Sequence, residues 1–87
     1  MTNLNKWDRY WHLYKLTQQD YEDLLDRQEG LCKICTEPLD DSGVVDHCHT
    51  TGKVRGLLCQ QCNSGLGFFK DSILSLLRAI KYLIKGK

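Results

Sequence analysis

The sequence has a single proline and no apolar run that approaches the ~20 residues needed to span a membrane. Residues 1–14 are polar and aromatic and lack the apolar segment of a secretory signal. We therefore expect no membrane span and a cytoplasmic location. Apolar residues make up 41% and charged residues 26%, which is the composition of a folded globular domain rather than a disordered chain.

Acidic residues are almost absent from the second part of the chain. Residues 53–87 hold seven Lys or Arg and one acid, Asp71, for a net charge of +6, whereas residues 1–52 hold five against ten, for −5. Basic side chains that contact phosphates provide most nonspecific affinity for nucleic acids. The asymmetry favours a polyanionic partner, although two halves that simply attract each other in the fold would give the same pattern.

Cysteine is the one residue type that is abundant for the size of the chain. A length of 87 residues predicts a single domain, 1–87, whose small core needs a metal or disulfides. Five cysteines allow two disulfides and a thiol, but a reducing compartment favours metal binding. Cys32, Cys35, Cys59 and Cys62 form two Cys-x-x-Cys pairs, which predict a closed, structural tetrahedral Zn²⁺ site. Reduced dithiols packed as small apolar groups, or a thiol redox protein, are the weaker alternatives.

Hydrophobic periodicity predicts helices at both ends of the chain, over residues 1–30 and 71–86. Aromatic residues recur at i, i+3, i+4 and i+7 in the first helix, which Asn3 can cap, and they are expected to face the core: Trp7, Tyr10, Trp11 and Tyr14. Thr17, with Asp20 three residues later, predicts the start of a second helix, and Gly30 suits its C′ position. Asp71 or Ser72 can cap the final helix, which has a wide apolar face.

The middle of the chain predicts a β-hairpin followed by a short helix. Strands are expected from Val44 and over residues 53–57, joined by a turn at residues 50–52. Gly56 inside the second strand indicates a bulge or a close backbone approach. Residues 59–66 read as a helix.

Asp46, His47, His49 and Asn63 remain once the zinc ligands are assigned. Oxygen atoms of Asp46 and Asn63 suit a hard divalent cation such as Mg²⁺ or Mn²⁺, and a neutral His47 can take a proton from water. Strand alternation places Asp46 and His47 on opposite faces, so they converge only if the strand is short, strongly twisted or bulged.

Three further residues of the hairpin have open roles. Lys53 and Arg55 are candidates for binding DNA phosphates. Cys48 is expected to be a buried small apolar residue rather than a ligand or a nucleophile. An ordinary polar hairpin is the alternative to a catalytic one, but the neighbouring Asn63 disfavours it.

These motifs resemble the recombination endonuclease VII family of phages, which belongs to the His-Me finger (HNH, ββα-metal) nucleases. The resemblance covers about residues 17–67 and rests on Cys32-x-x-Cys35, Asp46-His47-x-His49, and the run from Gly52 through Cys59-x-x-Cys62-Asn63 to Leu66-Gly67. It implies a small α+β fold, with a zinc-braced ββα-metal core over residues 31–67 flanked by the terminal helices. It also implies Asp46 and Asn63 as ligands of the catalytic metal, His47 as general base and His49 in the active centre.

Two departures from the family pattern shape the expected function. Cys48 stands where members of the family can carry an acid, so no role is transferred to it. The sequence ends soon after its last helix, without the longer region that junction-resolving members use for dimerisation. We therefore expect a DNA endonuclease that nicks duplex or branched DNA with weak specificity, a monomer rather than a dimer, in the host cytoplasm if a phage encodes it. The alternative is a non-catalytic zinc-ribbon-like module that binds nucleic acid or protein.

Overall fold

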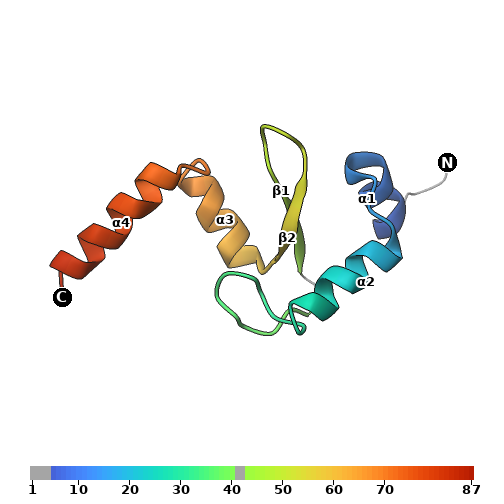
Figure 1. Ribbon diagram of the computed structural model, residues 1–87, viewed down its shortest axis with the longest axis horizontal. Coiled ribbons are helices and arrows are strands. Elements are labelled where there is room, and N and C mark those ends of the chain that lie inside the picture. The colour runs from blue at the N-terminus through green and yellow to red at the C-terminus, as the bar shows by residue number, and fades with distance from the viewer. Residues whose placement is uncertain (1–4, 41–42) are drawn as a thin grey trace.

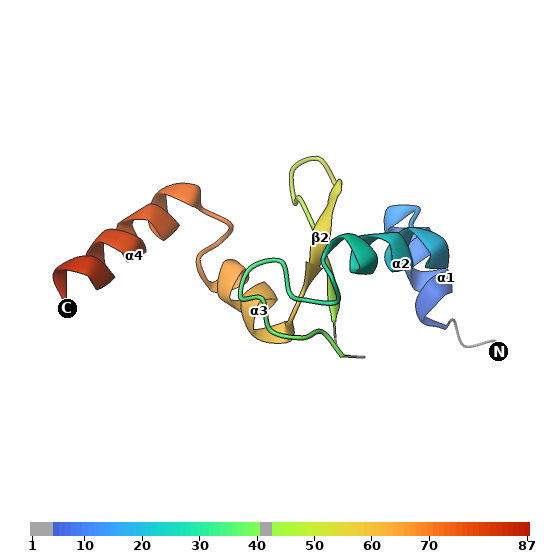
Figure 2. The same cartoon turned by 60° about the horizontal axis from the view of Figure 1, so that its bottom comes forward.

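A central hairpin separates two groups of helices in the computed structural model, which describes residues 5–40 and 43–87. In order along the chain, the elements are α1 (Lys6–Tyr14), α2 (Gln18–Arg27), β1 (Val44–His47), β2 (Val54–Leu58), α3 (Gln60–Phe68) and α4 (Ile73–Lys85). The molecule measures 53 × 27 × 22 Å, with α1 and α2 on one side of the hairpin and α3 and α4 on the other (Figures 1 and 2). The small α+β architecture is thus confirmed.

Side-chain caps start the two N-terminal helices. Asn5 caps α1 by accepting a hydrogen bond from the Asp8 N–H at 3.0 Å, while Asn3, the expected cap, lies outside the described residues. The predicted start of α2 is confirmed. Thr17 Oγ1 accepts from the Asp20 N–H, and the Asp20 carboxylate accepts from the Thr17 N–H, both at 3.0 Å.

The end of α2 differs by one residue from the prediction. Glu29, with φ 56°, occupies the left-handed C′ position assigned to Gly30, and Gly30 follows with φ 73°. The Gly30 N–H bonds to the Leu25 carbonyl at 2.9 Å and the Glu29 N–H to the Asp26 carbonyl at 3.0 Å, which makes a Schellman motif. The helix ends here because the left-handed backbone of Glu29 and Gly30 cannot continue it, and the side chain of Gln28, its C-cap, contacts β2.

The Gln28 amide pairs with the outer edge of β2 as a neighbouring strand would. Its Oε1 accepts from the Leu57 N–H and its Nε2 donates to the Leu57 carbonyl, both at 2.9 Å. A second Nε2 bond reaches the Leu31 carbonyl at 2.8 Å. This pairing satisfies the backbone of the most buried residue of β2 and fixes α2 beside the sheet.

The core lies between α1, α2 and the hairpin. Leu16, Tyr21, Val45 and Leu57 form its buried centre, and Trp7, Tyr10 and Tyr14 pack against it. The expected aromatic core is confirmed for these three residues but is wrong for Trp11, which is 47% exposed. Positions i, i+3 and i+7 of α1 face the core, whereas Trp11 lies at the edge of that face, beneath the ammonium of Lys15 at 5.2 Å from the ring centroid.

β1 and β2 pair with a break in register at the centre of the hairpin. Asp46 pairs with Gly56 and His47 with Val54, so Arg55 is an extra, unpaired residue of β2. A Cβ on Gly56 would lie 3.1 Å from both Gln28 Oε1 and Lys33 Cδ. The bulge and the close approach expected at Gly56 are therefore both present.

α3 and α4 are separated by a tight turn. α3 passes through Gly65 and Gly67 and ends at Phe68, two residues later than predicted. Ser72, rather than Asp71, caps α4 by accepting from the Ser75 N–H at 3.1 Å.

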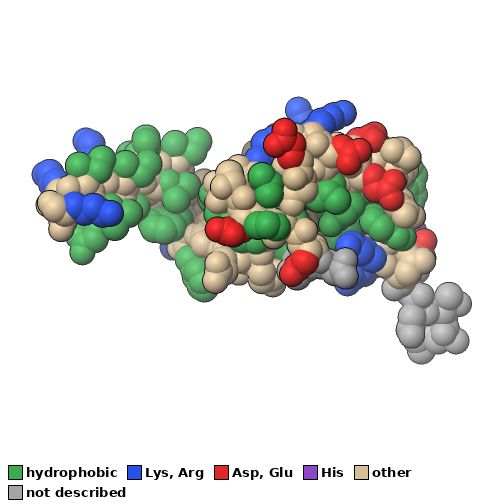
Figure 3. All heavy atoms as spheres, turned by 90° about the horizontal axis from the view of Figure 1, so that it is seen from below, with side chains coloured by type: hydrophobic (Ala, Val, Ile, Leu, Met, Phe, Trp, Pro, Cys, Tyr) green, Lys and Arg blue, Asp and Glu red, His purple; other side chains and the backbone are tan. Residues whose placement is uncertain are grey.

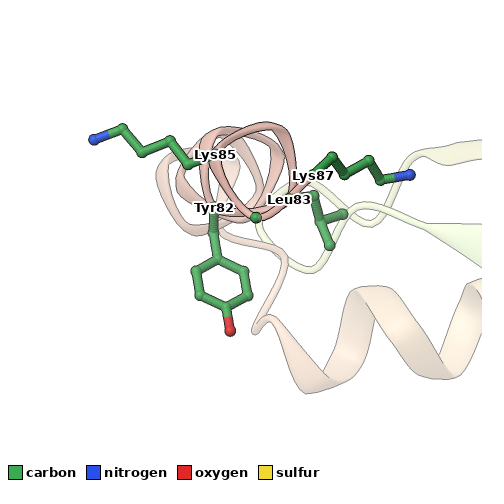
Figure 4. A pocket seen from close by; sticks show the side chains of 5 residues that line it. Tyr82, Leu83, Lys85 and Lys87 are labelled. Carbon is green, nitrogen blue, oxygen red and sulfur yellow. The ribbon is translucent and has the colours of Figure 1, made fainter.

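α4 projects from the body and leaves most of its large apolar side chains exposed (Figure 3): Ile73, Leu74, Leu77, Ile80, Leu83 and Ile84. A hollow at its last turn is lined by Tyr82, Leu83, Lys85, Gly86 and Lys87 (Figure 4) and holds no acid. In the described part of the chain, no helix is both long and apolar enough to cross a membrane.

Candidate active site and metal centre

The four paired cysteines converge between two segments of the chain. One is the turn that holds Cys32 and Cys35, before β1, and the other is the start of α3, which holds Cys59 and Cys62. Their sulfur atoms all lie within 4.8 Å of one another, and Cys35 Sγ and Cys59 Sγ are 3.7 Å apart. Thiolates around tetrahedral zinc, with Zn–S bonds of about 2.3 Å, stand about 3.8 Å apart. The predicted ligand set is thus placed to hold a metal ion, and its size and chemistry fit zinc.

Backbone groups already favour the ionised form of one of these thiols. Burial opposes ionisation of Cys32, but N–H groups of Cys59, Cys35 and Ile34 outweigh it and lower its pKa to about 6. Burial, together with shared hydrogen bonds to the other three sulfurs, raises the pKa of Cys62 to about 12. Four thiolates crowded together repel one another without a cation, so this cluster is electrostatically built for a metal.

The β-bulge brings Arg55 onto Asp46. Asp46 is 8% exposed, and its carboxylate accepts from Arg55 Nε at 2.7 Å and from Arg55 Nη2 at 3.0 Å. Asp46 is paired with Gly56, which has no side chain, and the extra residue Arg55 reaches across in its place. The hydrogen bonds and charge of Asp46 raise the pKa of Arg55. Asp46 is therefore a nearly buried side chain whose two carboxylate oxygens both face a cationic group.

Asp71, from the turn between α3 and α4, joins the same cluster. Its Oδ2 accepts from Arg55 Nη2 at 3.1 Å and lies 3.8 Å from His49 Nε2. Asp46 and Arg55 line one surface hollow, and His49 and Asp71 line another. The sequence predicted Asp71 only as a possible helix cap. Its position as the single acid in residues 53–87 could have indicated a contact with a basic residue.

The ring of His47 contacts two other rings, that of His49 and that of Tyr14 on α1. The His47 and His49 centroids are 4.9 Å apart with their planes tilted by 32°, and the His47 and Tyr14 centroids are 4.9 Å apart with their planes tilted by 40°. His47 is half-buried and His49 exposed. The aromatic face of α1, predicted as core, thus also supplies one wall for His47, a contact that the sequence did not reveal.

The model of one protein family, recombination endonuclease VII, matches residues 7–85. The chain belongs to the recombination endonuclease VII family.

Two relatives of this endonuclease VII family member come from phages of mycobacteria. This chain is 44% identical over 75 residues to "Gene 59 protein" of Mycobacterium phage D29, and the match covers 83% of this chain and 46% of that protein. It is 42% identical over 74 residues to "Gene 59 protein" of Mycobacterium phage L5, covering 82% of this chain and 45% of that protein. The chain therefore spans less than half the length of these curated relatives.

The remaining predicted site residues, Asn63, Lys53 and Arg55, lie in different surroundings. Asn63 lies half-buried in the first turn of α3, immediately after Cys62, and α3 packs against both strands. Lys53 is exposed beside the hairpin turn. Arg55, predicted to bind phosphate, has its guanidinium on Asp46 and Asp71.

Cys48 departs from its predicted burial. It follows β1 and is half-buried rather than in the core, because the chain has already turned toward the hairpin loop. The side-chain hydroxyl and backbone of Thr51 hydrogen-bond its sulfur and lower its pKa to about 7. It lies outside the four-cysteine cluster.

Proposed function

We propose that this chain is a divalent-metal-dependent DNA endonuclease in which β1, β2 and α3 form a ββα-metal (His-Me finger, HNH) core. The observation that carries the proposal is the nearly buried carboxylate of Asp46 at a β-bulge, directly before His47, whose ring contacts that of His49. The family match and the packing of α3, with Asn63 in its first turn, against the hairpin support it. The substrate is duplex or branched DNA, which the enzyme nicks as a monomer in the host cytoplasm.

Asp46 and Asn63 would hold Mg²⁺ or Mn²⁺. The donor set fits, because hard cations prefer carboxylate and amide oxygens, and Asp46 already binds a cationic group in the form of Arg55. When bound, the cation would stabilise negative charge on the scissile phosphate and on the leaving oxygen.

His47 would accept a proton from the attacking water. Its ring contacts those of Tyr14 and His49, and these contacts would help to orient the imidazole. Lys53 and Arg55 would bind backbone phosphates, and His49 would stand at the edge of the same site. Zinc at the four cysteines would brace the site, because Cys62 immediately precedes Asn63.

The test is relaxation of supercoiled plasmid by the zinc-loaded protein with Mg²⁺ or Mn²⁺. His47→Ala is expected to reduce the nicking rate by about 100-fold or more, in line with loss of a general base, and Asn63→Ala to reduce it comparably. His12→Ala is the matched control, because His12 is an exposed residue of α1 outside the site. Equal nicking by wild type and His47→Ala would reject the assignment. DNA binding without metal-dependent nicking would favour the zinc-ribbon-like binding module.

A further inference from the structure

Arg55 occupies the carboxylate that, in the proposed function, holds the catalytic cation. Two of its N–H groups bond to Asp46, one through Nε and one through Nη2. A guanidinium that bonds to both oxygens of a carboxylate weakens the binding of a divalent cation there, since the two charges repel and the guanidinium takes a lone-pair site on each oxygen. Release of part of this contact by Arg55 would therefore favour cation binding.

Asp71 provides a second acceptor for the same guanidinium. Nη2 of Arg55, which bonds to Asp46, also lies 3.1 Å from Asp71 Oδ2. Arg55 therefore need not become unpaired when it releases Asp46, because a small rotation of its side chain leaves it on a carboxylate already in contact.

The turn that carries Asp71 holds it in an uncommon backbone conformation. Lys70 and Asp71 both have positive φ, 55° and 56°, although neither is glycine. The Lys70 N–H bonds to the Gly67 carbonyl and the Asp71 N–H to the Leu66 carbonyl, each at 2.9 Å, so the turn is tied to the end of α3. Two consecutive non-glycine residues in this region fix the placement of Asp71, and such strain concentrates at functional sites.

Asp71 is also unusual in its charge. It is the single acid among residues 53–87, beside seven Lys or Arg. An acid needed only for solubility or capping has no reason to lie on Arg55, and Ser72 already caps α4.

We propose that Asp71 is a positioning residue that takes over Arg55 when a divalent cation binds Asp46, and that it thereby sets the affinity of the site for that cation. With Asp71 present, Arg55 shifts toward the turn and keeps one N–H edge free for a DNA phosphate. Without Asp71, Arg55 remains fully on Asp46 and weakens binding of the cation. This inference rests on the proposed catalytic metal site.

Binding of Mn²⁺ alone to the zinc-loaded full chain, followed by the EPR signal of free Mn²⁺ without DNA, tests it. Asp71→Asn removes the charge but keeps the turn, because asparagine tolerates positive φ. We expect the variant to bind Mn²⁺ about tenfold more weakly, the effect of one charge acting at this range. Arg55→Gln is expected to bind more tightly than wild type. Asp26→Asn, on the exposed face of α2, is the control for loss of one negative charge and should match wild type.

The double variant separates an indirect from a direct role. If Asp71 acts through Arg55, Asp71→Asn has less than about a twofold effect when Arg55→Gln is already present. Unchanged Mn²⁺ affinity in Asp71→Asn, or an undiminished effect in the Arg55→Gln background, would overturn the inference while leaving the nuclease assignment intact. Asn63→Ala binding Mn²⁺ as well as wild type would instead overturn the proposed metal site, and the inference with it.

Discussion

The side-chain amide of Gln28 takes the place of one peptide group of a neighbouring strand. It bonds to both backbone groups of Leu57, a residue 29 positions away and fully buried. No local pattern in the sequence indicates this contact, because glutamine at the end of an acidic helix is an ordinary surface residue. The sequence predicted where α2 begins, from Thr17 and Asp20. It did not predict that its C-cap, Gln28, bonds to the backbone of β2.

Replacing Gln28 with leucine is expected to destabilise the zinc-loaded protein by about 2–4 kcal/mol, because it leaves a buried N–H unpaired and weakens the bonding of the carbonyl. Urea unfolding at fixed zinc concentration measures the change. The matched control is Gln19→Leu, because the Gln19 amide donates to Asp23 on the exposed face of α2, and this change should cost about 0.5 kcal/mol or less. Equal midpoints for the two variants would show that the Leu57 contact adds no stability.

Among the catalytic candidates, residues close in sequence were predictable and those brought by tertiary contact were not. Asp46, His47 and His49 stand within one short segment, and residue chemistry alone selected them. Tyr14 and Asp71 come from α1 and from the turn after α3, and only the fold places them beside His47 and Arg55.

At the scale of elements, the cysteine cluster is what joins the two sides of the hairpin. Cys32 and Cys35 precede β1, and Cys59 and Cys62 follow β2. A bound ion would therefore link the turn before β1 to the start of α3. The spacing of these cysteines predicted the cluster, since local Cys-x-x-Cys geometry is largely independent of the surrounding fold. The bulge was only partly predictable: Gly56 indicated an irregularity, but the register that makes Arg55 the extra residue depends on strand pairing.

Zinc removal is expected to unfold the hairpin and α3, because apparent zinc-binding energies of ~10–16 kcal/mol equal or exceed the whole stability of a small domain. Chelation with EDTA, or Cys59→Ser, should abolish the cooperative thermal transition seen by circular dichroism. Cys48→Ser is the matched control and should retain both zinc and the transition, since Cys48 lies outside the cluster. An unchanged melting curve after complete zinc loss would contradict the structural role.

Over the whole molecule, the acidic and basic residues lie mainly at opposite ends, as the two groups of helices do. The acidic N-terminal part includes α2, whereas α4 and the turn before it carry most of the basic residues of 53–87. Composition predicted this division. The projection of α4 was not predictable from its sequence, because an amphipathic pattern shows which face is apolar but not whether another element covers it.

DNA affinity is expected to fall steeply with salt, because Lys and Arg that bind phosphates release counterions. His47→Ala, in which cleavage is expected to be slowed, allows binding to be measured by fluorescence anisotropy over a range of salt. Adding Lys53→Gln should reduce the slope of log K against log salt by about 1, the contribution of one phosphate contact. Lys15→Gln, in the acidic part of the chain, should leave the slope unchanged. Equal slopes for the two variants would remove Lys53 from the DNA interface.

The bulge at Arg55 also determines where the chain can gain or lose residues. Deleting one residue of β2 would restore a regular ladder, and the hairpin would still form, but no extra residue would then bring an arginine onto the Asp46 carboxylate. The turn over residues 48–53 lies beyond the bulge and closes with its own hydrogen bond of 2.7 Å from the Gly52 N–H to the Cys48 carbonyl. In comparisons with relatives, we therefore expect insertions and deletions to occur at residues 50–52, between the proposed site residues His49 and Lys53, while the lengths of β1 and β2 stay constant.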